Sequence, residues 1–115
     1  MDKETAKYIV TYFFHLLPDK EKLAWKHHSS ILKLEDNNSP KTIEIYKRKG
    51  WITEEKEIID LLKDGYDKFE IDTAKKIIEK YPDKIFLNKC PKCNQLARTP
   101  NAKQCRFCRF DWHNE

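Results

Sequence analysis

Four cysteines lie close together near the C-terminus, and no other feature constrains the fold of this 115-residue chain as strongly. They form two pairs, Cys90-Pro-Lys-Cys93 and Cys105-Arg-Phe-Cys108, in the pattern C-x2-C-x11-C-x2-C. Two residues between paired cysteines let a tight turn aim both thiolates at one point, while backbone N–H groups donate to the sulfurs. Two such turns supply the four soft ligands that tetrahedral zinc prefers. The spacing therefore predicts a structural zinc ion held by Cys90, Cys93, Cys105 and Cys108.

Three other uses of the cysteines are weaker. Two disulfides suit a secreted chain, but Asp2-Lys3-Glu4-Thr5 precedes any apolar run, so we expect no export signal. A thioredoxin-like redox pair needs one C-x-x-C at a helix start, not two clustered pairs. An iron–sulfur centre is the chemical alternative for four thiolates. Because four cysteines fill the zinc shell, we expect a structural metal with no open position for catalysis.

The residues around the cysteine pairs, or knuckles, carry further expectations. The spacer between the pairs contains the turn sequence Thr99-Pro100-Asn101 and is long enough for a short hairpin between the knuckles. Asn94 and Arg109 follow the knuckles, where glycine is common because the backbone favours a left-handed conformation. Asn tolerates that conformation better than Arg, which predicts a more strained or differently shaped second knuckle. We interpret His113 as a surface or outer-shell residue, not a ligand.

The C-terminal block resembles the zinc-ribbon tail of small, uncharacterised bacterial proteins. The residues that carry the resemblance are Asn88-Lys-Cys-Pro-Lys-Cys93, Gln104-Cys-Arg-Phe-Cys108 and Trp112-His113. The resemblance covers about residues 86–113 and implies a cytoplasmic protein, without implying an activity. It does not extend to residues 1–83. The sequence thus divides into a helical domain, 1–83, and a zinc ribbon, 84–115.

Apolar residues in the first 83 positions recur with helical spacing. The pattern predicts about five helices in a small bundle, with neighbours in sequence packing antiparallel. Only two glycines are present, which disfavours a many-stranded β protein. The one β-like segment is 85–87, and no internal repeat is apparent. The fold class is therefore mainly α, with a C-terminal four-cysteine zinc ribbon.

The predicted helices have recognisable starts and ends. Asp2 caps a first helix that reaches Leu17, and Asp19 caps the second. Ser39 with Pro40 opens the third, and Gly50 closes it. A fourth helix is predicted to start at Thr53 and to end at Gly65. A fifth is predicted to start at the capping-box-like pair Asp67 and Glu70.

Charge is unevenly distributed along the chain. Residues 1–83 are close to neutral, whereas residues 84–115 carry seven basic and two acidic side chains. Aromatics lie among these charges, including Phe107, Phe110 and Trp112. Bases stack on aromatic rings and phosphates bind basic groups, so this composition suits single-stranded nucleic acid. The candidate contacts are Arg98, Lys103, Arg106, Phe107 and Arg109; the alternative is that the charges offset the thiolates and the aromatics pack the ribbon onto the helices.

No catalytic motif accompanies the metal site. His27 and His28 are adjacent on a helix and point about 100° apart, and no metalloprotease, nucleophile-elbow or phosphate-loop pattern is present. An enzyme using these histidines, with His15, is the least favoured hypothesis. Trp51 follows Gly50 at a helix junction, where an aromatic can seal two elements. Tyr8, Tyr12 and Trp25 lie partly off the helical stripes, so an apolar patch left exposed there would mark a partner surface.

These observations lead to one main hypothesis and one alternative. We expect a non-enzymatic zinc-binding protein that binds another protein as an adaptor, regulator or inhibitor. The alternative is a nucleic-acid-binding regulator that uses the basic aromatic face of the ribbon. The most apolar stretch, 8–17, is too short to cross a membrane, so we expect no membrane partner.

Overall fold

The structure, a computed structural model, describes residues 1–113. Its helices are α1 (Lys3–Tyr12), the 3-10 helix η1 (Phe14–Leu16), α2 (Asp19–Leu34), α3 (Pro40–Arg48), α4 (Lys56–Asp60) and α5 (Tyr66–Lys80). This confirms the mainly helical fold class with a C-terminal cysteine cluster. In the same range the only β pairing is two isolated bridges, so the predicted β-like segment 85–87 forms no strand. No helix within these residues is both long and apolar enough to cross a membrane.

Two of the predicted helix starts are confirmed in detail. The Asp2 carboxylate accepts a hydrogen bond from the N–H of Thr5 at 2.8 Å. The Ser39 hydroxyl accepts one from the N–H of Thr42 at 3.2 Å, and Pro40 occupies the first helical turn. In both cases a side-chain oxygen satisfies an N–H group that has no partner inside the helix. These starts were predictable because the capping residue and its partner are three positions apart.

The other starts differ from prediction. Asp19 is the first residue of α2 and does not cap it. Thr53 lies outside α4, because its N–H donates to His27 Nδ1 at 3.0 Å and its hydroxyl accepts from Glu55 N–H at 3.1 Å. Likewise α5 already begins at Tyr66, after Gly65 at φ 95°, so the predicted pair of Asp67 and Glu70 falls inside the helix.

The first helix is shorter than its apolar pattern predicts. It ends at Tyr12, where Phe13 leaves helical geometry at φ −123° and ψ 30°. The rings of the next aromatics then turn toward different partners: Phe13 packs against Tyr8 and Phe14 against Trp25, with ring centroids 6.2 and 5.1 Å apart. The helix therefore ends at the point where Phe14 packs on Trp25 of α2.

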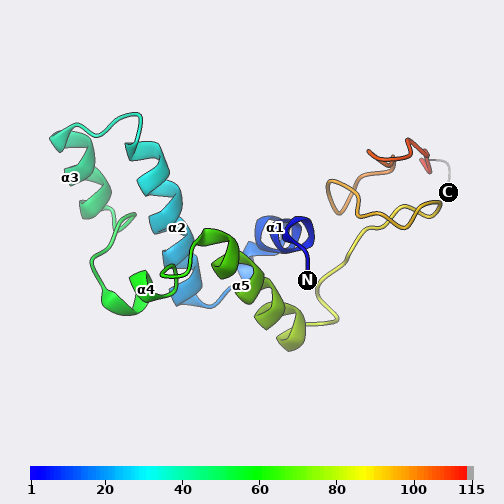
Figure 1. Cartoon of the computed structure of the whole chain (residues 1–115), viewed down its shortest axis with the longest axis horizontal. Helices are drawn as coiled ribbons and strands as arrows, with labels where there is room; N and C mark the ends of the chain where they lie inside the picture. Colours follow the sequence, from blue (N-terminus) through cyan, green and yellow to red (C-terminus); the bar gives the residue numbers. More distant parts are fainter. Residues whose placement is uncertain (114–115) are drawn as a thin grey trace.

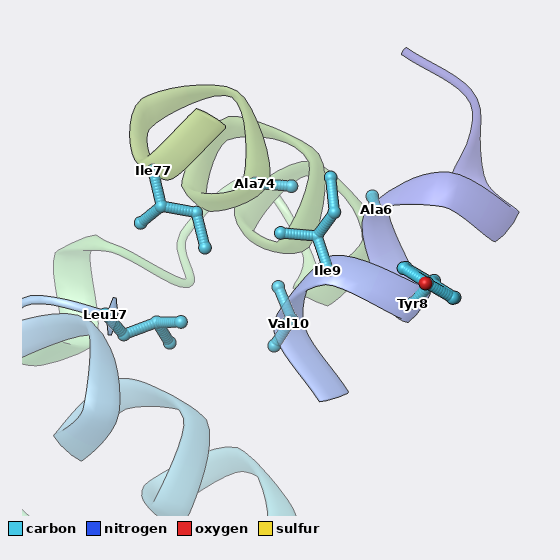
Figure 2. Close-up of a cluster of buried hydrophobic side chains, with 7 residues drawn as sticks. All are labelled: Ala6, Tyr8, Ile9, Val10, Leu17, Ala74 and Ile77. Atoms are coloured by element: carbon cyan, nitrogen blue, oxygen red, sulfur yellow. The ribbon is translucent and has the colours of Figure 1, made fainter. Parts of the chain in front are cut away.

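The main hydrophobic core joins α1 to α5 (Figure 2). These helices are far apart in sequence, so the principal packing contact is not between neighbours. The fully buried side chains of this core are Ala6, Tyr8, Ile9, Val10, Leu17, Ala74 and Ile77. A smaller core of Ala24, Ile58 and Phe69 lies among α2, α4 and α5.

The helices are spread along one axis. The molecule measures 52 × 30 × 22 Å with a radius of gyration of 17.1 Å, against about 13 Å for a compact domain of this length. Figure 1 shows α3 at one end, α1 and α5 in the middle, and the C-terminal segment at the other end. Helix α3 packs mainly on α2 and has no fully buried side chain. This shape leaves more side-chain surface open to partners than a compact bundle would.

Candidate metal centre

Two knuckles of the same construction form the C-terminal part, residues 84–113, which we call the cysteine segment. In the first, Asn94 N–H donates to the carbonyl of Cys90 at 2.9 Å. In the second, Arg109 N–H donates to the carbonyl of Cys105 at 3.0 Å. Asn94 and Arg109 adopt nearly the same left-handed backbone, with φ 63° and 65°. The left-handed positions were predicted correctly, but the second knuckle is not shaped differently from the first.

The pairing around the knuckles repeats in the same way. The bridge Lys89↔Leu96 flanks the first knuckle, and Gln104↔Asp111 flanks the second. Both residues of the second bridge lie fifteen positions after their counterparts in the first, as the cysteines do. The two knuckles therefore form a structural repeat that the sequence does not display. The expected hairpin between the knuckles is therefore absent in the described residues, because each knuckle pairs with its own flanks.

The four sulfur atoms converge on one point. All Sγ atoms lie within 4.8 Å of one another. Cys90 Sγ is 3.6 Å from Cys108 Sγ, and Cys93 Sγ is 3.5 Å from Cys105 Sγ. A tetrahedral metal with metal–sulfur bonds of about 2.3 Å would place its sulfurs about 3.8 Å apart, whereas a disulfide requires about 2.05 Å. All four cysteines are free, and their arrangement can hold a metal ion.

Backbone N–H groups around the second knuckle favour thiolates. The N–H groups of Phe107 and Cys108 donate to Cys105 Sγ at 3.3 and 3.4 Å. The Cys108 N–H lowers the pKa of Cys105 to about 6, with the Phe107 N–H adding to it against the opposing effect of burial. Because metal binding needs deprotonated sulfur, these donors prepare Cys105 as a ligand.

In the first knuckle only Cys90 is favoured as a thiolate: at Cys93 the Gln95 N–H lowers the pKa, but burial and hydrogen bonds with the other sulfurs outweigh it and raise the pKa to about 12. Burial works to raise the pKa of Cys90, but N–H groups of Cys93 and Lys92 outweigh it, so the pKa of Cys90 is lowered. Cys90 and Cys105 are each 2% exposed, whereas Cys108 is exposed to solvent. Each knuckle therefore presents one buried sulfur and one more accessible sulfur.

Asn88 organises the segment from below the site, and sequence analysis assigned it no structural role. Its side-chain amide donates to the carbonyls of Thr99 and Ala102, both at 2.9 Å, which fixes the predicted turn in the spacer. The backbone carbonyl of Asn88 accepts a hydrogen bond from the N–H of Ala97 at 2.7 Å. Asn88 is 6% exposed, and a buried amide with its groups paired specifies one conformation. The sequence carries no local signal for this role, because Asn88 and the turn that it fixes are separated along the chain.

The cysteine segment docks on α1. The Tyr8 hydroxyl donates to the carbonyl of Phe86 at 2.6 Å and accepts the N–H of Asn88 at 3.2 Å. Burial raises the pKa of Tyr8, so its hydroxyl stays protonated and able to donate. Arg106 also pairs with Glu4 on α1 at 3.0 Å. Tyr8 is therefore a buried clamp, not part of an exposed aromatic patch.

The aromatics of the segment divide between its interior and its surface. Trp112 is 7% exposed and packs with the buried cysteines, and Phe110 is half-buried next to it. Both are therefore unavailable as the stacking face that the sequence suggested. Phe107 is 57% exposed, and the Arg106 guanidinium lies 4.9 Å from its ring centre.

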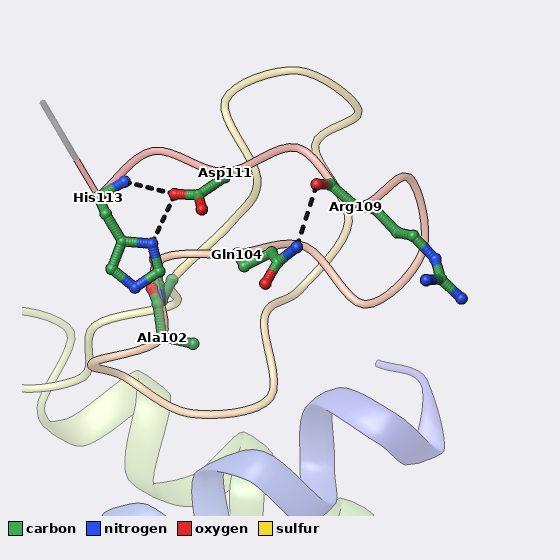
Figure 3. Close-up of polar contacts among 6 residues, drawn as sticks. Ala102, Gln104, Arg109, Asp111 and His113 are labelled. Atoms are coloured by element: carbon green, nitrogen blue, oxygen red, sulfur yellow. Dashed lines mark hydrogen bonds and ion pairs between the residues drawn. The ribbon is translucent and has the colours of Figure 1, made fainter.

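The structure brings only some of the predicted basic residues together. Arg98, Arg106 and Arg109 line one hollow of about 360 Å³ beside the second knuckle. Lys103 is exposed but does not line it. Figure 3 shows how the second knuckle is braced: Gln104 Nε2 donates to the Arg109 carbonyl at 3.4 Å.

The histidines lie away from the four sulfurs. His113 bonds to the Asp111 carboxylate through both its ring and its N–H (Figure 3). His28 stacks on Tyr66 with ring centroids 4.1 Å apart. Burial, with the nearby His28, lowers the pKa of His27, which keeps its ring neutral and its Nδ1 free to accept the Thr53 N–H. His15 is exposed on η1.

A scan against protein-family models, a search of curated proteins and a search of solved structures each found no match to this chain. The function proposed below is therefore derived from the geometry of this molecule alone.

Proposed function

We propose that the protein is a non-enzymatic, zinc-stapled interaction protein that binds another protein as an adaptor, regulator or inhibitor. The metal part of the proposal is supported by four converging sulfurs at separations that suit a tetrahedral thiolate shell. Zinc favours such a set and is not redox-active. With all four positions filled by Cys90, Cys93, Cys105 and Cys108, the metal has no position for a reacting water. Its role is to hold the segment folded.

The observation that carries the proposal is an apolar groove at the end of the molecule opposite the metal site. Leu23, His27 and Ile31 follow one face of α2 at four-residue intervals. They line two adjoining hollows against the 50–55 loop, and both hollows include Ile52. Leu23 and Ile31 are 45% and 41% exposed. Exposed aliphatic side chains that gather along a groove mark an interaction site more strongly than scattered ones.

Local bonding holds this groove open. Thr53 N–H donates to His27 Nδ1, which fixes the loop against α2. Trp51 lies under two ammonium groups, those of Lys26 and Lys49, 4.4 and 4.7 Å from its ring centre. The groove is therefore built before a partner arrives, which reduces the ordering cost of binding.

The rim of the groove indicates the kind of partner. Lys47, Glu54 and Glu55 border it, and Lys47 pairs with Glu54 at 3.8 Å. Charges of both signs around apolar side chains do not attract a polyanion, but they suit an amphipathic helix of another protein, with apolar anchors and charged flanks. We place this complex in the cytoplasm, because four thiols used as ligands suit a compartment in which disulfides are rare.

Capture of a partner by the full chain tests the proposal. We expect the wild-type protein to form a stoichiometric complex with a protein from its native lysate, and Ile31→Asp to weaken that complex about tenfold or more. Leu32→Asp is the matched control, because Leu32 is 49% exposed on the same helix but lines neither hollow. Repeated failure to capture a partner, or equal losses with Ile31→Asp and Leu32→Asp, would contradict the proposal.

A further inference from the structure

A second groove lies between α1 and the cysteine segment, on a different surface from the apolar groove. It consists of the hollow of about 360 Å³ beside the second knuckle and a neighbouring one of about 240 Å³ against α1. Both hollows are lined by Arg98 and Arg106. Lys7 lines only the α1 side, and Arg109 only the knuckle side. We call this surface the arginine groove; its cations are distributed over two adjoining hollows that share Arg98 and Arg106.

Carboxylates compensate little of the charge in the arginine groove. Glu4 is the one carboxylate among the residues lining either hollow, and it pairs with Arg106 at 3.0 Å. Among residues 1–113, Lys7, Arg98 and Arg109 have no carboxylate within ion-pair distance. A cleft lined by one sign of charge concentrates ligands of the opposite sign.

The α1 side of the groove also offers an aromatic surface. Tyr12 lines the hollow and is 41% exposed. Its ring meets the buried ring of Tyr8 edge-on, with centroids 5.5 Å apart, so one edge is supported while other faces stay open. Leu96 and Ala97 line the same hollow. A flat base can rest on such a surface while phosphates reach the cations.

We propose that the arginine groove binds the backbone of a single-stranded nucleic acid. Guanidinium groups hold phosphates through charge-assisted, two-pronged hydrogen bonds. Cations distributed over two adjoining hollows suit successive phosphates of one strand, whereas a single small anion would need only one of the hollows. Glu4 holds Arg106 between the two hollows, where it meets a strand passing from one to the other. This function is independent of the protein-binding groove on α2.

The test uses the full metal-loaded chain and a labelled oligouridine of about twelve nucleotides, followed by fluorescence anisotropy at about 50 and 200 mM salt. We expect salt-sensitive binding by the wild type. Arg98→Gln with Arg109→Asn should weaken it about tenfold or more. The slope of log affinity against log salt should become shallower by about 1.4, the value for two lost phosphate contacts on a single strand. Asn at 109 retains the left-handed backbone, as Asn94 does at the equivalent position.

The matched control changes the same net charge elsewhere in the cysteine segment. Lys92→Gln with Lys103→Gln removes two cations that line neither hollow, and we expect less than a threefold change. Absence of binding at about 50 mM salt, or equal losses in both double variants, would overturn the proposal. Competition separates the sources of phosphate. Displacement of the oligonucleotide by pyrophosphate at an equal concentration of phosphate groups would replace the strand with a small phosphate ligand and overturn it too.

Discussion

The helical region, 1–83, and the cysteine segment, 84–113, are held together by different physics. The helical region buries aliphatic and aromatic side chains between elements, above all between α1 and α5. The buried hydrophobic cluster of the cysteine segment has only four members, Cys90, Ala97, Cys105 and Trp112, and two of them are candidate metal ligands. About thirty residues cannot bury enough apolar area to fold alone. We therefore expect the cysteine segment, unlike the helical region, to need a metal ion to stay folded.

The two regions meet through a small, specific contact. Tyr8 is part of the α1–α5 core, and its hydroxyl bonds to both Phe86 and Asn88. Ile85, Leu87 and Leu96 pack against the same core. A metal ion at the four cysteines would therefore stabilise both the cysteine segment and its contact with α1.

Metal removal should have the largest effect of all, and it should affect only the cysteine segment. Chelation or Cys105→Ser should unfold the cysteine segment and leave the helices in place, because structural zinc supplies about 10–16 kcal/mol in small modules. Hydrogen exchange would show this as lost protection of the Ala97 and Trp112 N–H groups, which bond to the carbonyls of Asn88 and Lys103. Far-ultraviolet circular dichroism should retain its helical signal.

The control for that experiment is Lys103→Ser, an exposed change two residues before Cys105 that leaves all four sulfurs in place. It should keep both the metal and the protection. Undiminished protection of Ala97 and Trp112 in the metal-free chain would show that packing alone holds the segment.

Ile77→Ala is the counterpart for the helical region. Ile77 is 1% exposed in the α1–α5 core, so we expect a loss of about 2–5 kcal/mol in the free energy of unfolding, measured by urea titration. Leu32→Ala, at a site that is 49% exposed, should cost less than about 1 kcal/mol. The metal content of the folded Ile77→Ala protein should be unchanged. Loss of metal from Ile77→Ala at a urea concentration at which the wild type keeps its metal, with the helices of both still folded, would contradict the separation of the two regions.

Tyr8→Phe tests the contact between the regions. It leaves the Phe86 carbonyl without its donor and the Asn88 N–H without its acceptor, for an expected cost of about 1–3 kcal/mol. The readouts are the free energy of unfolding and faster hydrogen exchange at Asn88. Tyr12→Phe, in a ring that is 41% exposed, should have little effect. Equal effects of the two substitutions would show that the Tyr8 hydroxyl does not hold the cysteine segment on α1.

Arg109→Gly should give the smallest change, and in the stabilising direction. Arg109 holds φ 65°, a backbone that costs most side chains about 1 kcal/mol and glycine nothing. We expect a gain of up to about 1 kcal/mol in the stability of the cysteine segment, measured by competition of the metal with a chelator. Asn94→Gly should gain less, because Asn tolerates φ 63°. A larger gain at Asn94 would show that the knuckles differ in a way their backbones do not reveal.

Features encoded by nearby residues were predictable from the sequence. The cysteine spacing predicted the convergence of the sulfurs, and the positions after each knuckle predicted the left-handed backbone of Asn94 and Arg109. The starts at Asp2 and Ser39 were correct for the same reason, since each cap needs only a partner three residues away. Such features depend on local backbone geometry alone.

Features that depend on distant residues were missed. The clamp joins Tyr8 to positions about eighty residues further along the chain, and no helical period reveals it. The end of α1 at Tyr12 is decided by where the following aromatics find partners. Burial of Trp112 against the cysteines likewise follows from the fold of the whole segment. Helical periodicity gives the elements, but not the pairing of α1 with α5.

The most direct test of the account is native mass spectrometry with elemental analysis of protein purified without added metal. We expect one zinc ion per chain, lost in Cys105→Ser, with all four cysteines of the wild type bound as thiolates. Iron at the site, or a folded chain that carries no metal, would contradict the central claim that zinc holds the cysteine segment together.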